Sequence, residues 1–267
     1  MKLKLYLFRL LPFMLFSCDK EEEVAPSPII DSYERSFMVS SNGDGQDQIY
    51  HSYTLQHDNS GRVTRRGWKI RCQLSVCDPY ESGIYDTIVY HGNTVRLTSL
   101  SRHPELTVRE TETLIKLNKA NQPDYKVLWV QDIDRIDSVR YFYSGKGQLD
   151  SLTQYVVFSS GNYRKENTKK FTFDAQGNLS EIETRNYRSN GKIASIYTNI
   201  FGDYDTAPNP LRQLYMFDDT FYRSLSKNNF RSHQTKLLDV DDNTTYLSHK
   251  NTWHLKYDER GIPLFKR

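Results

Sequence analysis

The chain of 267 residues carries a formal net charge of +3, and 13% of its residues are aromatic, with tyrosine alone counting 19. The small charge is spread along the chain, and no block of lysines and arginines is interleaved with aromatics, so nucleic acid is not expected as a partner. The aromatic content favours pleated, half-buried sheets over helices.

The first segment of the chain, MKLKLYLFRLLPFMLFSCDKEEE, has the features of an export signal that ends in a cysteine. Basic residues precede an apolar stretch at 10–16 that is too short to span a bilayer. In the bacterial lipoprotein signals that this segment resembles, the cysteine receives lipid and becomes the new N-terminus. The resemblance implies a signal peptide at 1–17 and lipid attachment at Cys18, and the outer membrane is the expected location.

A plain secretory signal or a short membrane anchor is the alternative interpretation of the N-terminus. An anchor helix needs roughly 20 apolar residues, whereas Pro12 interrupts this stretch and charges begin at Asp19. The anchor alternative is therefore disfavoured.

An acidic run at 19–23 and a proline-bearing stretch at 24–28 follow the cysteine. The acidic run resembles the export tag of surface-displayed Bacteroidota lipoproteins, but a solvated start of a linker explains it equally well. The prolines favour an extended, semi-rigid tether. We therefore expect a lipidated N-terminus, tag and linker at 18–35, and a single all-β domain at 36–267, with a start of the folded part near Ile29 as the alternative to Ser36. Cell-surface exposure depends on the acidic tag alone.

A hairpin repeat organises the rest of the chain. Four segments show alternating apolar or aromatic residues on either side of a polar turn that ends in glycine: Tyr53 to Trp68, Val139 to Val156, Lys170 to Tyr187 and His254 to Arg267. The turn glycines are Gly61, Gly147, Gly177 and Gly261, and three of them follow an aspartate by three places, at Asp58, Asp174 and Asp258. An aspartate side chain at that spacing bonds its own backbone while glycine supplies positive φ. The pattern predicts β-hairpins.

The spacing of these turns, nearly multiples of about 29 residues, indicates a repeat architecture. Further turns are expected at Tyr90 to Asn93 and at Asn118 to Pro123. The region 101–117 is expected to be mostly strand, the continuously apolar run 127–130 a strand covered on both faces, and 222–230 a short helical or irregular segment. We predict an all-β fold: a wide, strongly curved antiparallel meander sheet or a rolled or closed barrel, built from repeated hairpins.

The segments HDNSGRV, FDAQGNLSEI and YDERGIP resemble the tyrosine-aspartate (YD, Rhs-type) repeats of bacterial surface proteins. Together with the lipoprotein signal and the stretch from Tyr204 to Phe230, they make most of the mature chain similar to a family of Bacteroidota lipoproteins of unknown function with a porin-like β fold. The resemblance implies that Asn209-Pro210 and 226–229 lie in a long connection before the last strands. The family offers no established catalytic residues to carry over. Charges clustered at 62–66 and 165–170 favour a lipid-tethered curled sheet over a membrane-spanning barrel.

The two remaining cysteines, Cys72 and Cys77, are close in sequence. An extended run would hold their Cα atoms roughly 16 Å apart at ~3.3 Å per residue, beyond the ~7 Å that a disulfide allows. A bridge therefore requires a turn, and the alternative is two separate buried residues. A zinc site is disfavoured because no second cysteine pair and no closely spaced histidine are present.

Asp239, Asp241 and Asn243 place oxygen atoms at alternate positions, as a calcium loop does. The full loop would have glycine at its sixth position and glutamate at its twelfth, where this chain has Thr244 and Lys250. A polar hairpin turn is the alternative, and no cofactor is expected.

Two functional hypotheses from different classes follow. The first is a non-catalytic envelope lipoprotein whose tyrosine-rich sheet binds a glycan or an envelope protein, or serves a structural role. The second is a glycan-acting hydrolase with carboxylates brought together across strands. Its candidate carboxylates are Glu110, Glu112, Asp132, Asp134 and Asp137. No catalytic signature is present elsewhere, so a role other than catalysis is favoured.

Overall fold

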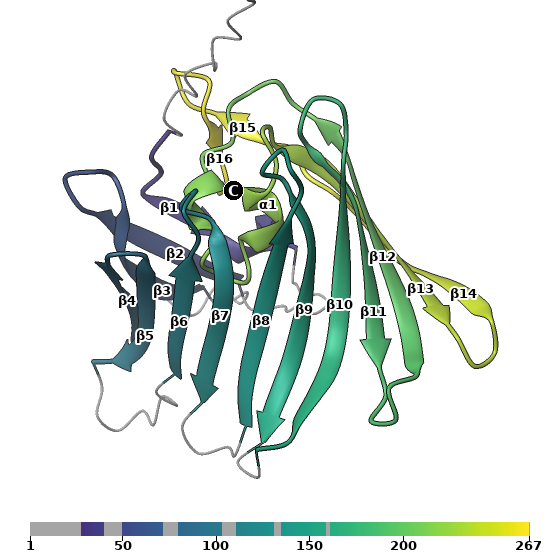
Figure 1. Cartoon of the computed structure of the whole chain (residues 1–267). Coiled ribbons are helices and arrows are strands. Elements are labelled where there is room, and N and C mark those ends of the chain that lie inside the picture. The colour runs from purple at the N-terminus through teal and green to yellow at the C-terminus, as the bar shows by residue number, and fades with distance from the viewer. Residues whose placement is uncertain are drawn as a thin grey trace, which may run out of the picture.

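The computed structural model describes residues 28–39, 50–71, 80–102, 111–130, 135–158 and 161–266. In this part of the chain, a single sheet contains 14 strands in chain order, β1 to β14, and β15 pairs separately with β16. Figure 1 shows the sheet curving around an inner face, with β1 towards one edge and β14 at the other. The predicted all-β, strongly curved antiparallel meander is confirmed.

The strand bounds show long, regular hairpins. The strands are β1 (Ser32–Glu34), β2 (Tyr50–His57), β3 (Val63–Arg71), β4 (Tyr80–His91), β5 (Thr94–Ser101), β6 (Thr111–Leu117), β7 (Pro123–Val130), β8 (Arg135–Tyr143), β9 (Leu149–Phe158), β10 (Tyr163–Phe173), β11 (Leu179–Tyr187), β12 (Ile193–Tyr204), β13 (Phe230–Asp239), β14 (Thr244–Thr252), β15 (Lys256–Tyr257) and β16 (Pro263–Leu264). Three short helices join them: η1 (Arg35–Phe37), η2 (Arg212–Leu214) and α1 (Phe221–Ser224).

The closed-barrel alternative is wrong, because β1 pairs with β2 and is not a neighbour of β14 in the sheet that the structure describes. The edge formed by β1 is covered by the end of the chain instead. The backbone N–H of Glu34 donates to the carbonyl oxygen of Phe265 at 2.7 Å. That bond pairs one backbone group of the edge strand without closing the sheet.

Seven of the hairpin turns share one geometry. The N–H of the first turn residue donates to the carbonyl four places on, and the N–H three places on donates back to the first carbonyl. These turns start at Asp58, Asn118, Ser144, Phe158, Asp174, Arg188 and Asp258. The fourth residue of each has positive φ, at Gly61, Asn121, Gly147, Gly161, Gly177, Gly191 and Gly261. This is the three-residue hairpin loop with a left-handed residue and a bulge, and the turns predicted at the four glycines and at Asn118 to Pro123 are confirmed.

The predicted aspartate caps are also confirmed. In the first turn, Oδ1 of Asp58 accepts hydrogen bonds from the N–H groups of Ser60 and Arg62 at 2.9 and 3.0 Å. Bonds from the Ser60 hydroxyl and from Arg62 hold the pKa of the Asp58 carboxyl below its ordinary value. In the degenerate turn, Asn118 makes the same two bonds with its side-chain oxygen.

The connection between β12 and β13, residues 205–229, folds back over the inner face of the sheet, and we call it the plug. Figure 1 shows α1 within the curve of the sheet, close to β15 and β16. Leu214 and Phe217 pack with residues of β2 to β6, and Phe221 and Tyr222 with residues of β9 to β13. These contacts form two buried apolar clusters that hold the plug on the sheet. The predicted long connection and its short helical segment at 222–230 correspond to the plug.

Arg223 is the most buried cation of the plug, with only 2% of its surface exposed. Its Nε donates to the carbonyl oxygen of Phe37 at 2.6 Å, and its Nη1 to that of Phe230 at 2.9 Å. The guanidinium carbon lies 4.9 Å from the ring centroid of Trp253 and 5.1 Å from that of Phe265. Burial lowers the pKa of Arg223 to about 9. One side chain thus joins the plug to both ends of the folded domain.

The folded part begins nearer to the earlier of the two expected starts, Ile29, than to Ser36. Ser32–Glu34 is strand β1, and Tyr33 is fully buried with its ring stacked on Tyr53 at 4.9 Å, so the linker does not extend to residue 35. Burial of the Tyr33 side chain stabilises β1, which has only 3 residues. The run 127–130 was expected to be covered on both faces, but Trp129 is 60% exposed. It points outward because its neighbour Leu128 lies on the inner side of the pleat.

Replacing Gly177 with alanine tests the turn geometry. Gly177 has φ +85°, and a Cβ there would meet no atom within 4 Å, so the cost of the change is conformational. We expect Gly177→Ala to lower the free energy of unfolding by about 1–2 kcal/mol in urea denaturation. Gly145 is an equally open glycine without positive φ, and Gly145→Ala should change stability by about 0.5 kcal/mol or less. Equal effects of the two changes would contradict the turn assignment.

Candidate binding face inside the sheet

The inner face changes from apolar to polar along the strands. Leu152, Phe171, Ile182 and Phe201 are buried in one of the apolar clusters that hold the plug. Four other side chains lie two, four or six places further along the same strands, on the same face of the sheet, and each carries an amide or a hydroxyl. These four are cross-strand partners and make a continuous line over β9 to β12, which we call the polar row: Gln154, Asn167, Asn186 and Ser195.

Hydrogen bonds connect neighbours within the polar row. Nδ2 of Asn167 donates to Oε1 of Gln154 at 3.0 Å, and Nδ2 of Asn186 donates to Oγ of Ser195 at 3.1 Å. The side-chain oxygen of Asn167 is buried and accepts no hydrogen bond from the residues that the structure describes. An unmet buried acceptor costs about 1–3 kcal/mol. A water molecule or a ligand hydroxyl donating to this oxygen would recover that energy.

A second polar group lies deeper, between β12 and β13. Oδ1 of Asn199 lies 2.9 Å from Nε2 of His233 and accepts a hydrogen bond from Thr235 at 3.0 Å. All three residues are buried. They stabilise the sheet beside the polar row and expose little surface to a ligand.

Ion pairs join two aspartates of the plug, Asp218 and Asp219, to cations on the inner face of the sheet. Nε of Arg66 donates to Asp86 at 2.7 Å, and its Nη1 donates to Asp219 at 2.9 Å. The hydroxyl of Tyr33 donates to Asp219 at 3.1 Å. Burial alone would lower the pKa of Arg66, but the surrounding acidic groups outweigh it and raise the pKa above its ordinary value. The Arg66 charge is therefore compensated from both the sheet and the plug.

Lys126 and Lys169 reach the plug from neighbouring parts of the inner face. Lys126 is paired with Asp218, and Nζ of Lys169 donates to the hydroxyl of Tyr222 at 2.8 Å. The side chain of Asp218 is 67% exposed, so it borders solvent on the inner side of the sheet. The sheet and plug atoms that surround Asp218 work to raise its pKa although its surface is open, but Lys126 and the other cations outweigh this effect and lower the pKa. The cations thus keep this carboxylate ionised.

The structure does not bring the predicted hydrolase carboxylates together where it describes them. Glu112 lies on the outer face, 3.5 Å from Arg96, and both side chains are largely exposed. Asp137 stands opposite Leu128 in the ladder, on the inner face. The sheet therefore separates these two acids. Glu110, Asp132 and Asp134 lie outside the described residues.

The proposed calcium ligands lie in the turn between β13 and β14. Oδ1 of Asp239 accepts a hydrogen bond from the N–H of Asp241 at 2.9 Å, and the carboxylate of Asp241 pairs with Arg188. Asn243 has a φ of 53° and completes the turn. Across the described ranges, no group of three or more His, Cys, Asp or Glu side chains is arranged to hold a metal ion. Calcium binding by this turn stays a prediction.

The cysteine predictions lie outside the described residues. This applies to lipid attachment at Cys18 and to the bridge between Cys72 and Cys77. The polar row and the buried cations Arg66 and Arg223 were not predicted as site residues. Alternation could have placed Asn167 and Asn186 on the inner face, but their alignment depends on strand register, which shifts once in each of the three ladders between β9 and β12.

Comparison with known proteins supports the fold. No protein-family model matches the sequence, and no curated protein matches it. The chain is similar to the crystal structure of a porin-like protein from Bacteroides uniformis ATCC 8492, with a TM-score of 0.52 and 13% identity over 89% of both chains. It is also similar to one from Bacteroides vulgatus ATCC 8482, with a TM-score of 0.53 and 14% identity over 89% of this chain and 90% of that chain. The predicted porin-like fold is confirmed.

Among the described residues, none of the helices has the length and apolar character needed to cross a membrane.

Replacing one buried and one exposed ion-pair aspartate tests the ion pairs. Asp219→Asn leaves the buried Arg66 with weaker compensation, so we expect the free energy of unfolding to fall by about 2–3 kcal/mol. Asp241→Asn removes a carboxylate that is 67% exposed from its pair with Arg188, which is 42% exposed, and its cost should be about 1 kcal/mol or less. Urea denaturation of both variants measures the difference. A larger loss for Asp241→Asn would contradict the assigned roles.

Proposed function

We propose that this protein is a non-catalytic binding module of the bacterial outer membrane, held by lipid on Cys18, and that the polar row on its inner face binds a glycan. The observation that carries the proposal is the unmet acceptor of Asn167 within a line of amides and a hydroxyl. Amides and hydroxyls offer both donors and acceptors, which is the chemistry that sugar hydroxyls require.

The extent of the polar row favours a chain-like ligand. From Gln154 on β9 to Ser195 on β12 the row crosses four adjacent strands. Neighbouring strands lie about 4.8 Å apart, so the row extends roughly 14 Å. Its members are half-buried, which leaves part of each side chain accessible. The Asn167 oxygen itself is covered, so a ligand hydroxyl reaches it when a neighbouring side chain moves aside. An oligosaccharide could make a hydrogen bond on each strand in turn.

The use of the three inner-face acids around the plug favours binding over hydrolysis. Glycoside hydrolysis needs one carboxyl group held as a proton donor and a second held ionised beside the sugar. Asp86 and Asp219 share Arg66, and Asp218 is paired with Lys126. All three acids are thus engaged in ion pairs that hold Arg66 and the plug in place, which assigns them to the fold.

The envelope location is supported by two independent features. The segment before Cys18 has the pattern of a lipoprotein signal, and the solved structures with this fold are described as porin-like proteins of Bacteroides. The chain from Cys18 to β1 at Ser32 would serve as the tether. Exposure on the cell surface rests on the acidic run at 19–23.

A combined localisation and binding experiment tests the proposal. The full-length protein should be recovered with outer membranes, and Cys18→Ser should release it into the soluble fraction. The released protein is then screened against an oligosaccharide array and assayed for cleavage products. We expect binding without cleavage.

Matched variants on opposite faces of β10 locate the binding surface. Asn167→Ala should weaken binding of the captured oligosaccharide about tenfold, a loss of about 1.4 kcal/mol. Thr168→Ala alters the next residue, on the other face of the strand, and should leave binding unchanged. Retention of Cys18→Ser on membranes, cleavage of the glycan, or equal losses in the two β10 variants would contradict the proposal.

A further inference from the structure

A second row of side chains lies on the inner face beside the polar row, two residues closer to the plug along each strand. Its members are cross-strand partners from β9 to β14: Leu152, Lys169, Thr184, Tyr197, Leu237 and Tyr246. The hydrogen bond from Lys169 to Tyr222 of the plug identifies the face. In Figure 1 the turn between β13 and β14 lies well away from α1, so one end of this row extends beyond the cover that the plug provides.

The exposure of this second row rises from one end to the other. Close to the plug, Leu152 is 5% exposed and Thr184 is 8% exposed. Tyr197 and Leu237 are half-buried, and Tyr246 on the edge strand β14 is 48% exposed. Three neighbouring side chains of apolar body are therefore accessible on the inner face, and we call Tyr197, Leu237 and Tyr246 the apolar platform.

The apolar platform and the polar row are adjacent. Ser195 of the polar row and Tyr197 of the platform are two residues apart on β12, and residues at this spacing lie roughly 7 Å apart on one face. The platform crosses three strands, from β12 to β14, which is roughly 10 Å at the usual strand spacing. A ligand lying over both must therefore present polar groups along one edge and an apolar flat face.

The charges beside the platform are mainly acidic. Asp239 is the cross-strand partner of Ser195, and Asp241 and Asp242 follow in the turn between β13 and β14. Arg188 pairs with Asp241. Asp242 accepts a hydrogen bond from the N–H of Thr244 at 2.7 Å, which holds the pKa of its carboxyl below the ordinary value. The excess of negative charge in this turn disfavours an anionic ligand.

We infer that the apolar platform and the polar row form one site for a neutral oligosaccharide whose ring hydroxyls are all equatorial. In such a ring the C–H bonds point to the two flat faces, while the hydroxyls surround the edge. The negative faces of the Tyr197 and Tyr246 rings attract C–H bonds, and the edge hydroxyls would meet the amides of the polar row. The inference rests on the proposed glycan-binding function, and it adds a contact surface and a ligand class.

Calorimetry with three probes tests the inference on the Cys18→Ser protein. Cellotetraose and N-acetylchitotetraose are neutral and have equatorial ring substituents, whereas tetragalacturonate is anionic. We expect at least one neutral probe to bind, and tetragalacturonate to bind about tenfold more weakly or not at all. Absence of binding by both neutral probes, or tighter binding of tetragalacturonate, would overturn the inference.

Variants of Tyr246 show whether its ring makes the contact. Tyr246→Ala should weaken binding of the neutral probe about tenfold, because it removes an aromatic surface. Tyr246→Phe removes only the hydroxyl, which donates to Asp242 at 3.3 Å, and should change the affinity about twofold or less. The side chain is nearly half exposed on an edge strand, so both variants should fold. A loss in Tyr246→Phe as large as that in Tyr246→Ala would contradict the role of the ring.

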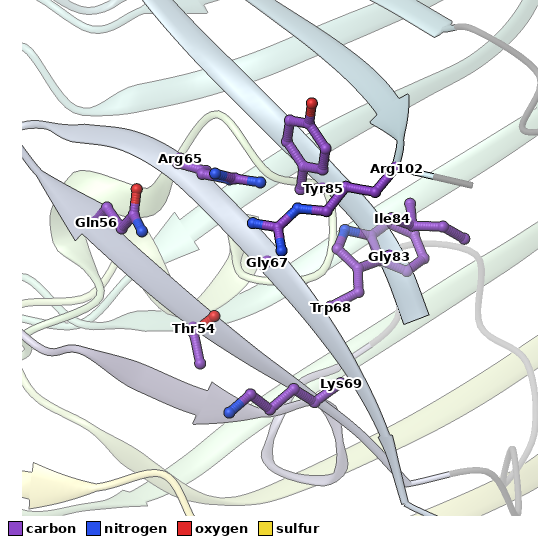
Figure 2. A pocket seen from close by; sticks show the side chains of 10 residues that line it. All are labelled: Thr54, Gln56, Arg65, Gly67, Trp68, Lys69, Gly83, Ile84, Tyr85 and Arg102. Atoms are coloured by element: carbon purple, nitrogen blue, oxygen red, sulfur yellow. The ribbon is translucent and has the colours of Figure 1, made fainter. Parts of the chain in front are cut away.

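Tyr85→Ala is the matched control on the opposite face. Tyr85 precedes Asp86, whose carboxylate pairs with Arg66 on the inner face, so the Tyr85 side chain lies on the outer face. Figure 2 shows Tyr85 there among the residues that line a pocket. The guanidinium carbon of Arg65 lies 3.9 Å from its ring centroid, so one face of the ring is already occupied. Tyr85→Ala should leave binding unchanged, and a loss equal to that of Tyr246→Ala would overturn the inference.

The outcome separates this inference from the proposed function. Losses of affinity for the same neutral probe in both Asn167→Ala and Tyr246→Ala would support both. If Asn167→Ala weakens an oligosaccharide that Tyr246→Ala does not affect, the platform is wrong and the function of the polar row stands. A loss in Tyr246→Ala without one in Asn167→Ala would contradict a site shared by the platform and the polar row.

Discussion

The buried guanidinium of Arg223 is the constraint on which the rest of the structure depends. It donates hydrogen bonds to the carbonyls of Phe37 and Phe230 and lies close to the rings of Trp253 and Phe265. These partners come from both ends of the folded domain. Lifting the plug would leave the two carbonyls unpaired and expose the rings, which makes the plug an integral part of the fold.

A fixed plug explains how an open sheet keeps its curvature. The plug fills the inner side with apolar residues such as Leu214 and Phe221, and Asp219 adds an ion pair to Arg66. Closure into a barrel is then unnecessary, because the plug already covers the apolar clusters of the inner face. The part that remains accessible contains the row of amides that we assign to ligand binding.

The hairpins could be predicted from the sequence because turn chemistry is local. Asp58 and Gly61 specify their turn within four residues, whatever the rest of the chain does. The site could not be predicted in the same way. Arg66 meets Asp219 across 153 residues, and Arg223 meets Phe37 across 186. Such contacts arise only when the plug folds back, and no local pattern encodes the register that aligns the polar row.

Hydrogen exchange of the plug tests the central claim most directly. The backbone N–H groups of Leu214 and Ser224 donate within the plug at 2.9 Å each. If the plug is an integral part of the fold, these amides should exchange as slowly as those of the central strands β9 to β12, through global unfolding. Exchange of the plug amides orders of magnitude faster than the strands would show that the plug opens independently, and would contradict the account.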